Sequence, residues 1–331
     1  MTAHLNRRTA LLAGAGLTAS AMLPGMAWAQ SPTKLRFAAV FSETDIRAEM
    51  IKRLSADLAP NYEIEAHLNS SLFRQGTELV ALQRNNLEMG NIAPQDISKQ
   101  VPAWSVLTAA YLFRDAKHLN HFFASDLGTQ MKKQVEEQLK VKILGPTFFG
   151  TRHVGLRGKK KIETPADLNG VKLRMPAGDA WQLLGRSVGA NPTPLAYAET
   201  YTGLQTGTVD GQDNPLPNIQ NMKFYEVMGQ IVLTSHLVAF DLLTLNLKTW
   251  ESMSADGQKA FQAAVDKAIA WSTDEHVKRE AELAENFKRQ GLEVYTPNID
   301  AFREHAKKIY LASSEAKAWA PGIFDQIAAI K

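Results

Sequence analysis

The chain has 331 residues, a formal net charge of +3 at pH 7 and no cysteine. Its length predicts about two domains. Its 45% hydrophobic and 21% charged residues are typical of a globular protein, which excludes a wholly disordered chain. The lack of cysteine excludes disulfides, zinc–thiolate and iron–sulfur sites and thiol nucleophiles, and the small net charge argues against a nucleic-acid partner.

The N-terminus has the pattern of an export signal. Arg7 and Arg8 precede an uncharged, moderately apolar run that ends with Ala27 and Ala29 in the small-x-small pattern of a signal-peptidase site. A twin arginine before such a run is typical of the twin-arginine export route. We therefore predict a signal peptide over residues 1–29, cleavage near Ala29 and a periplasmic mature protein without a spanning helix. An uncleaved N-terminal membrane anchor is the alternative.

The first half of the mature chain alternates between strand and helix patterns. Short runs of apolar residues predict strands, and apolar residues at helical spacing predict helices. The pattern predicts strands over residues 34–40, 62–68, 87–92 and 142–145 and helices over residues 45–58 and 78–86. Another helix precedes the last of these strands. This β-α-β-α order favours an α/β sheet with helices on its faces.

The same alternation restarts after residue 150. The pattern predicts strands over residues 171–175 and 237–247 and helices over residues 164–168, 180–188, 254–289 and 299–312. The helix at 254–289 is exceptionally long. Ser254 is a suitable N-cap for it, and Gly291 is a suitable C-terminal stop.

Three short motifs have chemical interpretations that their sequence context weakens. The G-x-S-x-G pattern centred on Ser187 matches a nucleophile elbow, but it ends a helix pattern instead of following a strand. An exported serine hydrolase using Ser187 is therefore only an alternative. His118 and His121 have the spacing of metal ligands without an evident third ligand. Residues 210–214 resemble the start of a calcium loop without its downstream glutamate, so we predict neither a metal nor a cofactor.

Three polar residues favour an anion site. Arg174 lies at the end of a predicted strand, and Arg152 follows the strand-like residues 145–150. Ligands of open α/β sheets bind beyond the carboxyl ends of the strands, and a guanidinium matches a carboxylate with two parallel hydrogen bonds. Asn214, between a glycine turn and Pro215, has an amide that both donates and accepts. We predict that these three residues form a carboxylate clamp on loops.

An ordered series of segments resembles one protein family. The segments are GVKLRMP at 170–176, GANPTP at 189–194 and ETYTGLQTGTVDGQDNP at 199–215. The series strongly resembles the substrate-binding proteins of tripartite ATP-independent periplasmic (TRAP) transporters of the DctP type, most specifically over residues 204–215. The resemblance extends to residues 112–115, residues 224–227 and Trp250, so it covers essentially the whole mature chain.

The resemblance implies an α/β, two-lobed periplasmic binding protein fold with a hinge and a long helix that spans both lobes. On that basis we predict lobe I in residues 30–149 and 241–280 and lobe II in residues 150–240 and 281–331. The implied function is capture of an organic acid without catalysis. A monomer would deliver this acid to a permease of one small and one large membrane subunit, and it would need no nucleotide site. A ligand-sensing module for a signalling partner, or ligand binding through a metal, remains an alternative.

The resemblance also assigns site residues. Arg174 matches the arginine that pairs with the ligand carboxylate, Arg152 and Asn214 match its neighbours in the site, and Tyr197 matches an aromatic residue that flanks the ligand. Further candidates for the ligand wall are Phe41, Gln95, Phe149, Trp181 and Phe240.

The sequence departs from the sialic-acid-binding members of the family at two polar positions. Their acidic pocket residue corresponds here to Pro94 or Gln95, and their asparagine after the clamp arginine corresponds to Ala177. These departures argue against sialic acid and favour a small, fairly apolar monocarboxylate or hydroxy acid. C4-dicarboxylates, sugar acids and aromatic acids remain open.

Overall fold

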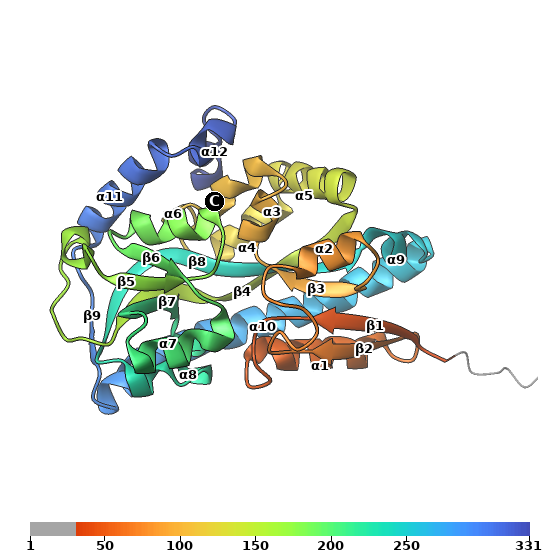
Figure 1. Ribbon diagram of the computed structural model, residues 1–331. Coiled ribbons are helices and arrows are strands. Elements are labelled where there is room, and N and C mark those ends of the chain that lie inside the picture. Colours follow the sequence, from red (N-terminus) through yellow and green to blue (C-terminus); the bar gives the residue numbers. More distant parts are fainter. Residues whose placement is uncertain (1–30) are drawn as a thin grey trace, which may run out of the picture. The chain divides into compact units, whose positions relative to one another are not determined.

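One mixed β-sheet organises the protein (Figure 1). The computed structural model describes residues 31–331, and the predicted signal peptide with its cleavage near Ala29 lies outside the described residues. The strand order is β2-β1-β3-β8-β4-β7-β5-β6, and β9 pairs with β8. The strands are β1 (Thr33–Ala38), β2 (Tyr62–His67), β3 (Met89–Ile92), β4 (Val141–Leu156), β5 (Lys172–Met175), β6 (Asn191–Pro194), β7 (Gly211–Pro215), β8 (Gln230–Asn246) and β9 (Glu293–Tyr295).

The long antiparallel pair β4 and β8 joins the two halves of this sheet. It runs from the Val141–Asn246 pair to the Leu156–Gln230 pair, with three shifts of register between them. One half of the sheet is completed by β3, β1 and β2, and the other by β7, β5 and β6. Such register shifts increase the local twist, which lets two strands of this length serve both halves. The predicted lobe boundaries within the chain stay a prediction.

Helices cover both faces of the sheet, as the alternating pattern predicts. The α-helices are α1 (Ile46–Leu58), α2 (Glu78–Gln83), α3 (Pro94–Ser98), α4 (Ala116–Ala124), α5 (Asp126–Leu139), α6 (Asp179–Ser187), α7 (Thr200–Thr206), α8 (Leu216–Asn221), α9 (Leu247–Glu251), α10 (Ala255–Arg289), α11 (Ile299–Leu311) and α12 (Ile323–Ala328). A short 3₁₀ helix, η3 (Tyr197–Glu199), precedes α7.

The long helix α10 connects the cores of both halves (Figure 1). Phe261 and Val265 pack in one hydrophobic cluster with α1 and β1, whereas Leu283 and Phe287 pack in another with α7 and α8. The Ser254 hydroxyl accepts the N–H of Gly257 at 3.1 Å, so the predicted N-cap is confirmed. Among residues 31–331, no helix combines the length and the apolar character that crossing a membrane requires.

Two strands are longer than the sequence predicts, and this corrects the predicted site. The patterns at 142–145 and 237–247 are parts of β4 and β8, whose register shifts interrupt the period-two alternation. Arg152 therefore lies inside β4, and Asn214 lies inside β7. The prediction that both residues lie on loops is wrong. Backbone pairing within the sheet holds these two residues more rigidly than loops would.

Glu280 of α10 contacts β4 near the middle of the chain's longest strand pair. Its carboxylate accepts the N–H of Thr151. The preceding Gly150 has a φ of +119°, and a Cβ there would lie 2.7 Å from the Cβ of Pro215, so only glycine suits this crossing. Burial raises the pKa of Glu280 to about 7.

We expect the free energy of unfolding to fall less between pH 5 and pH 8 in Glu280→Gln than in the wild type. The pKa of Glu280 is higher in the folded than in the unfolded protein, so folding takes up a proton in this window and the free energy of unfolding falls as pH rises. Because glutamine does not ionise, the fall in the free energy of unfolding over this pH range should be smaller by about 1–3 kcal/mol. Urea unfolding at both pH values measures this. The exposed Glu282→Gln is the control, and equal pH dependence in both variants would contradict the prediction.

Candidate ligand-binding site

A cavity of about 280 Å³ lies where the two halves of the sheet meet. Its walls come from α1, β3, β8 and the loop before α2 in one half, and from β4, β5, β7, α6, α8 and η3 in the other. This volume lies just below the usual range for small-molecule sites, about 300–1,000 Å³. The cavity therefore suits a metabolite rather than a peptide.

Most of the predicted ligand residues border this cavity. They are Phe41, Phe149, Arg152, Arg174, Trp181, Tyr197 and Asn214. Gln95 and Phe240 border a space of only about 10 Å³ behind Phe149 and Trp181. The ring of Phe240 packs edge-on against Phe113 and Phe123, which places it in the core behind the cavity wall.

Arg174 is a buried cation that forms no ion pair with an acidic residue in the part of the chain that the structure describes. It lies in β5 beside β7 and is 1% exposed. Its Nε donates to the carbonyl of Leu195 at 2.9 Å, whereas Nη2 has no hydrogen-bond partner among residues 31–331. Burial lowers the pKa of Arg174 to about 10, so the guanidinium stays charged at neutral pH. A buried, unpaired charge is unfavourable, and an anion in the cavity would pair it.

Arg152 differs because the protein already neutralises it. Its Nε and Nη2 lie 2.7 and 2.9 Å from the two carboxylate oxygens of Asp213. Nε2 of His236 lies 3.1 Å from the same carboxylate. Burial alone would raise the pKa of Asp213, but the charge and hydrogen bonds of Arg152 hold it well below its ordinary value. Arg152 therefore offers hydrogen-bond donors in a fixed position but no uncompensated charge.

Strand pairing brings the three predicted clamp residues together. In the β4–β7 pair, Arg152 lies opposite Pro215, directly beside Asn214. In the β5–β7 pair, Arg174 lies opposite Gln212. The Asn214 amide donates to Oε1 of Gln212 at 2.6 Å, and its oxygen lies 3.4 Å from Nη2 of Arg152.

A third buried arginine, Arg47, also borders the cavity and was not predicted from the sequence. Its guanidinium carbon lies 4.4 Å from the ring centroid of Phe41 and 4.1 Å from that of Phe149. These two aromatic residues, predicted as ligand wall, thus also hold a protein cation between them. Arg47 lies in the first turn of α1, and such a position reads in sequence as ordinary helix surface.

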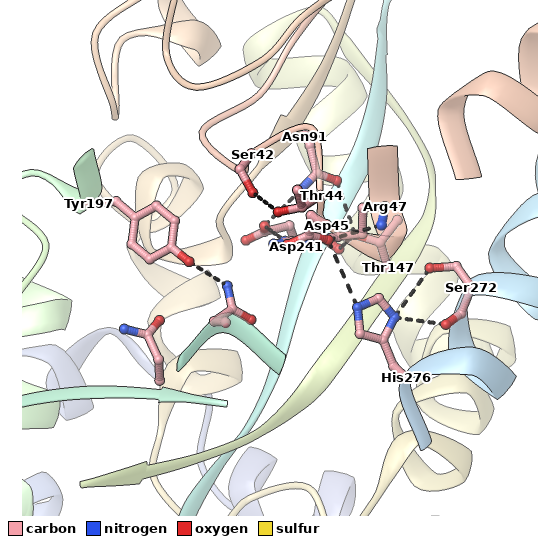
Figure 2. A network of polar contacts seen from close by, with 12 residues as sticks. Ser42, Thr44, Asp45, Arg47, Asn91, Thr147, Tyr197, Asp241, Ser272 and His276 are labelled. Carbon is pink, nitrogen blue, oxygen red and sulfur yellow. Dashed lines mark hydrogen bonds and ion pairs between the residues drawn. The ribbon is translucent and has the colours of Figure 1, made fainter. Parts of the chain in front are cut away.

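Two carboxylates neutralise Arg47 (Figure 2). Its side chain binds both oxygens of Asp45 at 2.9 Å, and its Nη1 lies 2.8 Å from Oδ2 of Asp241. Asp241 also accepts the amide of Asn91 at 2.7 Å. Burial raises the pKa of Asp241 to about 6. Asp45 was missed because its position before α1, where it accepts the N–H of Arg47, is that of an N-cap.

The rest of the cavity lining combines polar residues with apolar ones such as Val40, Ala93 and Leu195, and the predicted fairly apolar ligand stays a prediction. Arg74, Gln75, Glu78, Asp96, Glu199 and Asn218 all border the cavity. Glu78 is 3% exposed; its Oε2 accepts the N–H of Gly76 at 2.7 Å, but its Oε1 has no partner among residues 31–331. Burial raises the pKa of Glu78 to about 7. Groups of this kind suit a ligand that carries hydroxyls.

The three short motifs found in the sequence have structural roles. Ser187 is fully buried at the end of α6, and its hydroxyl donates to the carbonyl of Leu184 at 2.7 Å. Nε2 of His118 lies 2.9 Å from the carbonyl oxygen of Ile327. In the part of the chain that the structure describes, no three His, Asp or Glu residues are placed to hold a metal ion. Residues 211–214 belong to strand β7, not to a calcium loop.

Comparison with known proteins gives a consistent set of relatives. Residues 40–317 match the family model DctP, described as bacterial extracellular solute-binding protein, family 7. The sialic acid-binding periplasmic protein of Vibrio cholerae is 32% identical over 210 residues. That alignment spans 63% of this chain and 65% of the relative, just under two thirds of its length.

Two solved structures are similar over nearly the whole described chain. One is a TRAP periplasmic solute-binding protein from Roseobacter denitrificans with bound 3-deoxy-D-manno-oct-2-ulosonic acid (KDO). It is 39% identical with a TM-score of 0.89 and covers 91% of this chain and 100% of that one. The other, also from R. denitrificans, has bound L-galactonate. It is 25% identical with a TM-score of 0.81 and covers 90% and 99% of the two chains.

Proposed function

Because the chain belongs to the DctP family of bacterial extracellular solute-binding proteins, we propose that it captures a sugar acid in the periplasm and delivers it to a TRAP permease. The family and the two-lobed α/β fold predicted from the sequence are confirmed. Members of this family are periplasmic binding subunits of transporters and not enzymes. The twin-arginine signal, cleavage near Ala29, the monomeric state and the small and large permease subunits are parts of the proposal.

The unpaired guanidinium of Arg174 carries this proposal. Arg47 is bound by two carboxylates and Arg152 by one, whereas Arg174 is the buried arginine of the lining that forms no ion pair with a carboxylate of residues 31–331. One buried guanidinium without an ion-pair partner calls for one anionic group. We therefore infer that the ligand has a single carboxylate, which takes the Nη2 hydrogen bond left open in the protein.

Hydroxyl groups on the ligand are favoured by the acidic part of the lining. Glu78 and Asp241 offer carboxyl groups to the cavity, and a second carboxylate of the ligand would be repelled there. Hydroxyls, in contrast, donate to such groups. KDO and L-galactonate, bound by the two similar structures, are both hydroxyl-rich acids with one carboxylate. This shared chemistry supports a sugar acid as the ligand.

We expect the mature protein to bind KDO or an aldonate in a calorimetric and thermal-shift screen. A ligand at 100 times its dissociation constant should stabilise the fold by about 2.7 kcal/mol. The panel should include uronates, sialic acid, C4-dicarboxylates and neutral sugars, each with and without a chelator. Equal or tighter binding of a C4-dicarboxylate would contradict the single-carboxylate argument. A folded protein that binds no acid would contradict the proposed function as a whole.

A further inference from the structure

We propose that Asn218 and Tyr197 form a second recognition element, which hydrogen-bonds one hydroxyl group of the ligand apart from its carboxylate. This inference rests on the proposed function, because it concerns what a captured acid must carry besides its carboxylate. Both residues border the cavity, and both are buried. Asn218 lies in α8 and Tyr197 in η3, on segments that follow β7 and β6.

The polar atoms of this pair are only partly satisfied by the protein. Nδ2 of Asn218 donates to the Tyr197 hydroxyl at 3.0 Å. Tyr197 is labelled in Figure 2. Oδ1 of Asn218 is buried and has no hydrogen-bond partner among residues 31–331. Rotating the amide by 180° exchanges its two atoms but still leaves one of them unpaired. The pair therefore presents at least one open hydrogen-bonding position to the cavity.

The tyrosine adds a donor beside that position. Burial raises the pKa of Tyr197 to about 12, so its hydroxyl keeps its proton at neutral pH. With Nδ2 of Asn218 donating to the tyrosine oxygen, the hydroxyl proton is available to a ligand, next to the unpaired Oδ1. A single alcohol group can donate to Oδ1 and accept from Tyr197 at the same time. The arrangement is thus complementary to one hydroxyl.

Among residues 31–331, the Asn218 side chain makes one hydrogen bond, the one to Tyr197. Pro215 occupies the N-cap position of α8, and no side chain caps that helix end. If an apolar residue replaced Asn218, the Tyr197 hydroxyl would be the buried polar group that loses its partner. A buried amide oxygen without a partner is unfavourable, so its presence beside a cavity points to a ligand group that completes it.

The pair stands in a fixed relation to the carboxylate-binding residue. The Tyr197 ring centroid lies 5.8 Å from the guanidinium carbon of Arg174. The ring packs edge-on against Phe224, and the Tyr197 N–H donates to Oε1 of Gln75 at 2.8 Å. Because Phe224 packs against the ring and Asn218 donates to its hydroxyl, the atoms that would bind the ligand hydroxyl keep one spacing from Arg174. A ligand must therefore present its carboxylate and one particular hydroxyl at that spacing, which selects among sugar acids of the same size.

The test compares Asn218→Leu and Tyr197→Phe with the wild type by calorimetry. The probes are KDO, L-galactonate and a series of deoxy analogues that each lack one hydroxyl. We expect the wild type to bind one deoxy analogue about 10- to 100-fold more weakly than its parent acid. Asn218→Leu should bind the parent acid more weakly than the wild type does by the same factor. It should bind that deoxy analogue with the same affinity as the wild type. Asn221→Leu, a matched change in the same helix at a residue outside the cavity lining, should bind like the wild type.

Each result decides between named alternatives. Unchanged binding by a folded Asn218→Leu protein would show that water alone occupies this position and would overturn the inference, while leaving sugar-acid capture intact. An equal loss for the parent and every deoxy analogue would assign Asn218 a packing role instead. Absence of binding of any sugar acid by the wild type would overturn the proposed ligand class and this inference together. Melting temperatures of all variants confirm that each protein is folded.

Discussion

Arg174→Met should weaken ligand binding strongly and leave the empty protein at least as stable as the wild type. Removing one partner of a buried, hydrogen-bonded charge pair costs about 2–5 kcal/mol, or roughly 30- to 5,000-fold in affinity. In the empty protein, by contrast, Arg174 is buried and Nη2 is unpaired among the described residues. Methionine fills similar space without the desolvation penalty, so the free energy of unfolding should stay equal or rise by about 1–2 kcal/mol.

This combination separates a binding residue from a structural one. Calorimetry with a sugar acid and urea unfolding without ligand measure the two quantities on the same samples. Arg74→Met is the matched control, because Arg74 also borders the cavity but is exposed. Its effect on affinity should stay within about fivefold, corresponding to an exposed charge interaction of up to 1 kcal/mol. Affinity of Arg174→Met within threefold of the wild type would rule out Arg174 as the carboxylate partner.

Asp213→Asn should destabilise the fold by about 3–5 kcal/mol, because it leaves the buried Arg152 guanidinium without a countercharge. Replacing both residues, as in Arg152→Met with Asp213→Leu, removes both charges and should restore most of that stability. Urea unfolding at pH 7 of the single and double variants measures the difference. A single variant as stable as the wild type would contradict the assignment of this pair as a mutually dependent buried ion pair.

The pH dependence of this variant has a definite sign. The pKa of Asp213 is lower in the folded than in the unfolded protein. The stability that the ionised Asp213 contributes to the fold is therefore fully present above the ordinary carboxyl pKa of about 3.9. This stability is lost progressively as the pH falls below that value. The wild type should lose stability between pH 5 and pH 3 more steeply than Asp213→Asn.

Local pattern predicted the regular parts of the fold. The predicted helix at 45–58 corresponds to α1, and the predicted helix at 254–289 corresponds to α10, because both combine helical spacing with suitable caps. The full lengths of β4 and β8 were not predictable. Each is interrupted by shifts of register that break the alternation, and whether such a strand continues depends on its partner far along the chain.

The site was predictable where a residue lies at a strand end or in a family motif, as for Arg174. Arg47, Glu78 and Asn218 were missed for a common physical reason. Each lies on a short or ordinary helix, where arginine, glutamate and asparagine are normally solvated. Only the meeting of segments distant in sequence buries them around one cavity. The pairing of their polar atoms in the folded protein indicates a ligand site. The local sequence does not determine that pairing.

The central position of β8 determines the order in which the chain can fold during synthesis. β3 ends at Ile92 but pairs with residues near Leu245, so one half of the sheet waits for some 150 further residues to be made. β4 likewise has its longest partner about 90 residues downstream. Until β8 has left the ribosome, β3 and β4 expose unpaired edges that favour aggregation. Fragments that stop before Gln230 should therefore fail to fold, and the whole protein should acquire its structure late and cooperatively.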